Sequence, residues 1–202
     1  GTEVYTVDGS ITSSLDSELL DLMELPQLPD LDEKNITSVQ LELTDGTVRQ
    51  LTSAVETRET EVETETGETD ENGEPIYETT TETEEITLWS LDGQPLPEGA
   101  VGLEDWLYDL STLYLDSCSA FKADQEELSA CGMDGASLLT VSLTSGETFT
   151  LAIGGQTEDG SYVYAALEAP APGCDLFLIS ADKARTLSDL NYESLSANEE
   201  AE

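Results

Sequence analysis

The stretch SLLTVSLTSGETFTLAIGG, residues 137–155, decides the fold. Apolar and polar side chains alternate from Leu139 to Leu143, and the alternation resumes after Gly146. Successive side chains of a strand point to opposite faces, so this pattern is typical of strands that cover a core with one face. A glycine between two such runs marks a tight turn. The stretch therefore predicts a β-hairpin.

A second stretch, VQLELTDGTVRQL at 39–51, repeats this pattern 100 residues earlier. When it is placed above 139–151, apolar residues coincide at 39/139, 41/141, 43/143 and 51/151, and Gly46 matches Gly146. Asp45-Gly46 favours a type I′ turn, which needs positive φ at both central positions. The segments 4–23 and 176–190 also share a strand followed by a helix. We hypothesise two related units, each a strand meander covered by a helix, with the first unit circularly offset.

Helical spacing of apolar residues predicts the covering helices. Apolar residues at helical spacing predict an amphipathic helix over 101–113; they are Leu103, Trp106, Leu107, Leu110 and Leu113. Further helices are expected at 13–25, at 180–190 and, as a short turn ended by Gly132, at 123–131. The remaining strands are expected at 4–8, 86–91, 114–121, 161–168 and 174–180.

These elements predict an α+β fold of antiparallel β meanders covered by helices. We divide the chain into a strand–helix opening at 1–35 packed on the body, a first β/α unit at 36–121, and a second meander with its helix at 122–192. A disordered tail is expected at 193–202.

The Thr- and Glu-rich segment 56–85 has no hydrophobic face and contains 13 acidic residues and one basic residue, Arg58. Thr favours strands, and Glu71-Asn72-Gly73-Glu74 at the centre is a turn signal. We predict a long acidic β-ribbon inserted in the first unit. Its distal part is expected to be mobile or disordered, because Glu opposite Glu repels.

Composition excludes several functions. The chain has 45 acidic and 6 basic residues, a formal charge of −39, which repels nucleic acids and anionic membranes. It has no His, which removes Ser-His-Asp and Cys-His catalysis and His-ligated zinc. The three cysteines, Cys118, Cys131 and Cys174, form no CxxC motif. Three small, mostly buried thiols are favoured over a Cys118–Cys131 bridge, which stays open.

The sequence offers only weak candidates for catalytic residues and for metal ligands. Carboxylate pairs such as Glu104-Asp105 are common in so acidic a chain, and these two begin a helix, where acids favour the dipole. The spacing of Asp70, Asn72 and Glu74 imitates the start of a calcium loop, but no Glu occupies the twelfth position. The sequence Thr157–Gly160 is a plain turn. Only three lysines, Lys34, Lys122 and Lys183, are available for a Ser–Lys dyad. We therefore expect no catalytic residue, no cofactor and no metal ligand.

Four aromatic residues could line a ligand groove, but at strand and helix spacing the core is the favoured place for them. They are Trp89, Trp106, Tyr162 and Tyr164.

The run CGMDGASLLTVSLTSGETFTLAIGGQTEDGSYVYAALEAPAPGCDLFLIS, residues 131–180, resembles the signature region of an uncharacterised bacterial family, a domain of unknown function. The shared features are a Gly-x-Asp start at 132–134, the hairpin ending in Ile153-Gly154, the strand Tyr162-Val163-Tyr164, and the strand 176–179 that leads into a helix. Cys131 stands where the family has an aromatic residue. ITLWSLDGQPLP and the helix at 101–113 resemble the family's strand–helix unit.

This resemblance implies location and function. Members are anchored by one N-terminal transmembrane helix, lie outside the cytoplasmic membrane, and are often encoded beside ABC-type exporter components, including gliding-motility-like ones. The chain opens at Gly1, and we expect such an anchor ahead of it. The resemblance favours a non-catalytic accessory that binds an envelope or membrane protein, such as an exporter subunit. The alternatives are an extracytoplasmic ligand- or calcium-binding module and, less favoured, a carboxylate-dependent hydrolase.

Overall fold

The computed structural model of the chain describes residues 24–69 and 75–198. The strand expected at 4–8, residues 13–23 of the expected first helix, and the turn expected at 71–74 lie outside these ranges. The described elements, in chain order, are η1 Glu33–Asn35, β1 Ile36–Glu42, β2 Val48–Thr69, β3 Pro75–Leu91, β4 Gln94–Pro95, α2 Val101–Ser111, β5 Ser117–Ala120, α3 Gln125–Ala130, η2 Met133–Gly135, β6 Ser137–Leu143, β7 Thr148–Gln156, β8 Tyr162–Ala166, β9 Leu176–Ser180, α4 Ala181–Ser188 and α5 Tyr192–Leu195.

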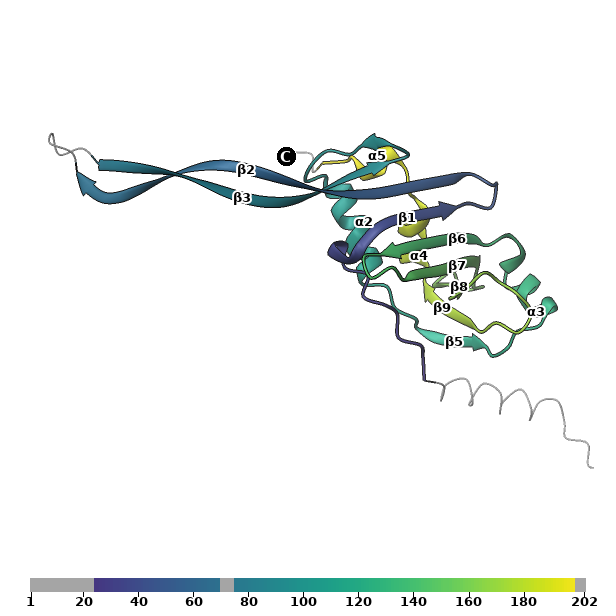
Figure 1. The fold of residues 1–202 in the computed structure, drawn as a ribbon. Helices are drawn as coiled ribbons and strands as arrows, with labels where there is room; N and C mark the ends of the chain where they lie inside the picture. Colours follow the sequence, from purple (N-terminus) through teal and green to yellow (C-terminus); the bar gives the residue numbers. More distant parts are fainter. Residues whose placement is uncertain (1–23, 70–74, 199–202) are drawn as a thin grey trace, which may run out of the picture.

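The described strands form one nine-stranded sheet in the order β4-β3-β2-β1-β6-β7-β8-β9-β5, and all of its pairings are antiparallel (Figure 1). The α+β class is confirmed. At the centre, β1 pairs with β6, and Gln40 lies opposite Thr140. The sequence-based division assigned β5 to the first unit. Strand β5 pairs with β9 and forms the edge farthest from β4.

The two predicted hairpins, β1–β2 and β6–β7, are present, and their turns have the same geometry. In each turn a glycine N–H donates to a leucine carbonyl, Gly46 to Leu43 and Gly146 to Leu143, over 2.9 Å. The glycine alone has positive φ, +81° at Gly46 and +86° at Gly146. A three-residue loop with one left-handed residue therefore replaces the expected type I′ turn at Asp45-Gly46. Two consecutive residues with positive φ occur instead at Asp92-Gly93, between β3 and β4.

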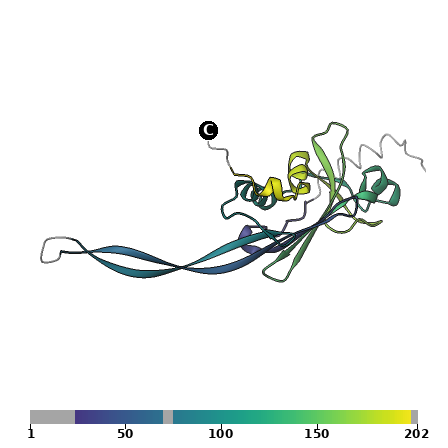
Figure 2. The ribbon, with the colours of Figure 1, turned by 90° about the horizontal axis from the view of Figure 1, so that it is seen from above.

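One face of the sheet carries the main core. Alternate residues of the central strands are fully buried there, and helices α2, α4 and α5 cover them (Figure 2). From the sheet, Leu41, Leu51, Leu139 and Leu151 are 0% exposed. From α2, four of the five apolar residues that predicted this helix are buried, which confirms the spacing argument, and the fifth, Leu113, is buried just beyond the end of the helix.

A smaller cluster lies on the opposite face, beneath α3 and η2. Leu128 and Met133 pack with Ala152 and Leu176 there. The backbones approach closely at this point, because Gly155 N–H donates to the Cys131 carbonyl over 2.8 Å. A Cβ at Gly154 would lie 2.9 Å from that carbonyl oxygen. Because Gly154 and Gly155 have no side chains, the end of α3 can pack closely against the end of β7.

The tail that was expected to be disordered, residues 193–202, overlaps a helix. Residues Tyr192–Leu195 form helix α5, and Leu195 is buried in the main core. Helix α5 packs against α2 at Gly102, where a Cβ would lie 2.0 Å from the Ser194 carbonyl oxygen. The Gly102 N–H also donates to the Ala197 carbonyl over 3.0 Å. The sequence signal was weak because only one turn of helix, with one buried leucine, is involved.

Candidate functional site: the ribbon and its root

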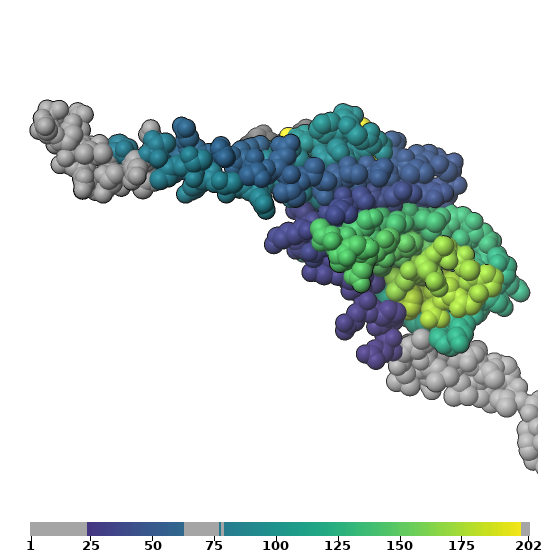
Figure 3. Space-filling model, viewed as in Figure 1, coloured from purple at the N-terminus to yellow at the C-terminus, as the bar shows by residue number. Residues whose placement is uncertain are grey.

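Strands β2 and β3 continue far beyond the rest of the sheet as a two-stranded ribbon, which confirms the predicted hairpin. The last pairing of β2 with β1 joins Thr52 to Ser38, and β2 then runs on to Thr69. At about 3.3 Å per residue, residues 54–69 extend for about 50 Å. Figure 3 shows this ribbon as a narrow arm that leaves the rounded body. The expected mobility of its tip concerns residues 70–74, which are outside the described part of the chain.

The register of the ribbon differs from the expectation that Glu would face Glu. Thr83 lies opposite Glu59, Thr81 lies opposite Glu61, and Arg58 lies opposite Glu84. Thr and Glu alternate in both strands, and the register offsets the two patterns so that like charges are not direct neighbours across the pair. Directly opposed like charges destabilise a strand pair, and this register avoids that cost.

Within residues 24–69 and 75–198, neither outer edge of the ribbon has a strand neighbour. On one side, β1 leaves β2 after the Ser38–Thr52 pair. On the other side, β4 pairs with β3 only at Ser90 and Leu91, and the Leu96 N–H adds one hydrogen bond to the Trp89 carbonyl. Beyond these points, alternate backbone N–H and C=O groups of each strand point outward. Such edges are templates for an added strand.

The ribbon begins at a fixed root. Ser53 Oγ donates to the Ile36 carbonyl over 3.0 Å, and the two Arg58 Nη atoms donate to the two carboxylate oxygens of Glu98 over 3.2 and 3.1 Å. The hydrogen bonds and charge of Glu98 raise the pKa of Arg58. Both side chains are about half exposed, so this ion pair orients the root more than it stabilises the fold.

A small cavity, the root pocket, lies where β4 leaves β3. It has a volume of about 80 Å³, and its lining includes Glu33, Trp89, Leu96, Leu103, Glu104 and Leu107. Trp89 is 5% exposed, and its indole N–H donates to Glu33 Oε1 over 3.0 Å. The pocket therefore combines apolar walls with carboxylates. Sequence reasoning missed it because Glu33 and Trp89 are 56 residues apart.

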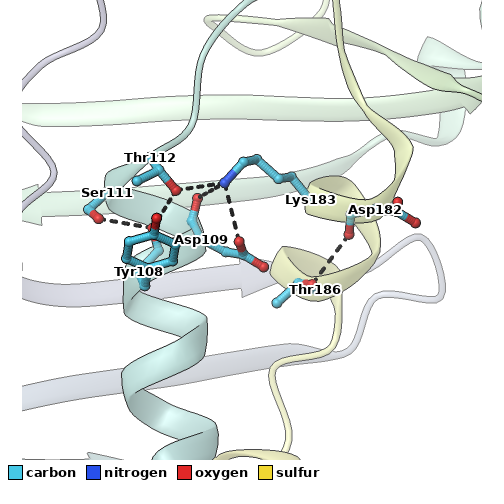
Figure 4. Close-up of polar contacts among 7 residues, drawn as sticks. All are labelled: Tyr108, Asp109, Ser111, Thr112, Asp182, Lys183 and Thr186. Carbon is cyan, nitrogen blue, oxygen red and sulfur yellow. Dashed lines mark hydrogen bonds and ion pairs between the residues drawn. The ribbon is translucent and has the colours of Figure 1, made fainter.

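A second polar cluster joins α2 to α4 (Figure 4). Lys183 Nζ donates to Thr112 Oγ1 over 2.6 Å and lies 3.2 Å from Asp109 Oδ1. The Thr112 hydroxyl in turn donates to the Tyr108 carbonyl over 2.7 Å. Lys183 of α4 therefore contacts two side chains at the C-terminal end of α2. This cluster links the two helices.

The acidic residues considered for chemistry are not brought together. Glu104, in the first turn of α2, and Asp105, which follows it, are both exposed. Asp159 belongs to the turn at 157–160, where hydrogen bonds from Thr157 and the Ser161 N–H lower its pKa. The residues of the calcium-like spacing, Asp70 to Glu74, lie outside the described ranges. Among the described residues, no group of three or more Cys, Asp or Glu side chains could hold a metal ion.

The aromatic and sulfur side chains are mainly structural. Both tryptophans are buried, and Tyr162 and Tyr164 are half-buried on β8. All three thiols are free; Cys118 and Cys174 are buried and Cys131 is half-buried, which agrees with the favoured interpretation. Burial raises the pKa of Cys118 and Cys131, so both thiols are poor nucleophiles near neutral pH.

Comparisons with known proteins give no match: no family model, no curated protein and no solved structure is significantly similar to the chain. No helix in the described ranges combines the length and the apolar character needed to cross a membrane.

Proposed function

We propose that this protein is a non-catalytic binding module, and that a basic, extended segment of a partner protein adds as a strand to its ribbon. One observation carries the proposal: two paired strands leave the body, and no other strand among the described residues pairs with their outer edges. Nearly all ribbon side chains whose positions are described are exposed, including Val55 at 66% and Tyr77 at 56%. Such a ribbon buries little apolar surface and adds little to the core, which favours a role outside folding.

Charge indicates the partner. Glu59 and Glu61 of β2 share one face, and Glu82 and Glu84 of β3 share the other. Residues two apart on a strand point to the same side. A partner strand in which Lys or Arg alternates with a small polar residue would therefore place its cations beside either pair. Opposite charges on neighbouring strands are favourable, and their field would also speed association.

The same charges disfavour a second copy of the chain as the added strand. Two acidic edges would repel each other, and charged edges are a common protection against edge-to-edge association. The proposed partner is therefore a different, basic protein.

The resemblance at 131–180 supports a location for this interaction. We propose that the module is extracytoplasmic, is tethered by a membrane helix ahead of Gly1, and serves an envelope or exporter assembly whose subunit supplies the basic segment.

A finer proposal concerns the architecture. We propose that the body combines two related units and that the ribbon is an insertion in the first. Support comes from the β1–β6 pairing, in which Gln40 lies opposite Thr140, the residue that matches it when 39–51 is aligned with 139–151. The shared turn geometry at Gly46 and Gly146 adds to it.

A charge-matched pair of variants tests the binding function. The ribbon variant replaces four exposed glutamates by Gln: Glu59, Glu61, Glu82 and Glu84. The body variant replaces four exposed glutamates elsewhere: Glu126, Glu158, Glu168 and Glu193. Both are titrated by calorimetry with an acetylated peptide of alternating Lys and Thr, at about 0.15 M salt.

The proposal predicts that the ribbon variant binds the peptide roughly tenfold more weakly than the unmodified protein, because several cross-strand charge pairs are lost. The body variant should bind almost normally. Equal weakening of both variants would show only a general attraction to an acidic surface, and it would overturn the proposal.

A further inference from the structure

The geometry points to a specific occupant of the root pocket: we propose that it receives a lysine side chain of the partner segment. This inference rests on the proposed function, because the lysine would come from the strand that adds to β3. It names the residue type that fixes the partner's position along an otherwise repetitive ribbon.

The position of the root pocket supports this inference. Thr87, Leu88 and Trp89 of β3 contribute to its lining, and the free edge of β3 begins at the same residues, where β4 ends its pairing. A strand added along β3 toward the body would therefore arrive at the pocket mouth. The β4–α2 connection, which also lines the pocket, occupies the next part of the edge and prevents the added strand from continuing.

The lining suits a long side chain with a terminal cation. Leu96, Leu103 and Leu107 are at least 92% buried and supply apolar walls for an aliphatic stem. The indole of Trp89 offers an aromatic surface that attracts an ammonium group. Glu33 and Glu104 supply carboxylates for charge-assisted hydrogen bonds.

The local charge balance also favours a cation. The lining of the root pocket contains three glutamates, Glu33, Glu98 and Glu104, and no basic residue. Among the described ion pairs, Glu98 is the one glutamate of this lining that has a basic partner, Arg58. The volume of about 80 Å³ is several times the roughly 10–15 Å³ that holds one water, so the end of a side chain can enter.

The Trp89 indole N–H is a direct reporter, because its acceptor Glu33 Oε1 would also contact the ammonium. The chain has only two tryptophans, so an indole ¹H–¹⁵N spectrum contains two signals to assign. The Lys-Thr peptide is titrated into the whole protein, and both signals are followed. We expect the Trp89 signal to move with the binding isotherm, while the signal of Trp106, in the core, stays in place.

Two conservative variants complete the test. Glu33→Gln and Glu104→Gln change exposed side chains and keep their shape, and each should weaken peptide binding about two- to fivefold. The control, Glu168→Gln, should bind as the unmodified protein does.

The outcomes separate the two proposals. If the peptide binds and the charge-neutralised ribbon variant weakens it, while the Trp89 signal and the Glu33→Gln affinity stay unchanged, the pocket inference is overturned and the ribbon function stands. If the peptide does not bind even at low salt, both are overturned. Movement of the Trp89 signal together with weaker binding by both pocket variants supports the inference.

Discussion

The body and the ribbon are built from the same antiparallel pairing but are held by different interactions. In the body, one face of each central strand is sealed by helices, and residues such as Leu139 and Leu151 are inaccessible to solvent. In the ribbon, the described side chains are mostly exposed, and the strands are joined mainly by backbone hydrogen bonds and by contacts between neighbouring exposed side chains. Strand pairing therefore sets the shape of both regions, whereas burial sets the stability of only one.

The largest expected effect is a cavity in the body. Leu139→Ala should lower the free energy of unfolding by about 3–5 kcal/mol, because a fully buried side chain is lost and its surroundings relax only partly. Urea denaturation followed by circular dichroism measures this change. Val55→Ala in the ribbon is the matched truncation and should cost less than about 0.5 kcal/mol, since Val55 is largely exposed. Similar losses at the two sites would contradict the contrast between body and ribbon.

The next effect concerns the cluster that joins α2 and α4. Lys183→Met should cost about 1–2 kcal/mol, because Asp109 and Thr112 lose a charged hydrogen-bond donor that is only 19% exposed. Arg185→Met, on the same helix, removes an exposed ion pair with Asp182 and should cost less than about 0.5 kcal/mol. A double-mutant cycle of Lys183→Met with Asp109→Asn isolates the pair. Coupling indistinguishable from zero would remove this cluster from the account of the body's stability.

A smaller effect tests the two similar turns. Gly46→Ala and Gly146→Ala each place a side chain at positive φ, with no other atom within 4 Å of the added Cβ. Each should cost about 1–2 kcal/mol from backbone strain alone, or about 2–8 °C in melting temperature. Scanning calorimetry of both variants gives the comparison. Clearly unequal costs would count against the equivalence of the two hairpins.

The smallest effect is expected from shortening the ribbon. Replacing residues 59–83 by Asn-Gly connects the paired residues Arg58 and Glu84 through a tight turn. The melting temperature should change by less than about 2 °C, because the removed part packs against no core. Loss of cooperative unfolding in this variant would sink the view that the ribbon is an addition to a self-sufficient body.

Local patterns predicted most of the fold. Alternation at 139–143 and 39–43 identified the hairpins, and the apolar spacing of Leu103 to Leu110 identified α2. These patterns are strong because each reflects one face sealed from water over several residues. The Thr–Glu alternation likewise indicated the ribbon, although it gave no register and therefore no view of which charges would be neighbours.

Long-range contacts were not predictable in this way. Strand β5 has only four residues and obtains its place from β9, almost 60 residues later in the chain. The root pocket joins Glu33 to Trp89, and the helix cluster joins Thr112 to Lys183, 71 residues apart. Single polar residues carry no periodicity, so only the fold brings these partners together.

The most direct test of the account is calorimetric titration of the ribbon-shortened protein with the Lys-Thr peptide, beside the full chain at the same salt concentration. The account predicts that the full chain binds and the shortened protein does not, although the shortened protein keeps its fold and most of its negative charge. Unchanged affinity in the shortened protein would contradict the claim that the ribbon is the binding arm.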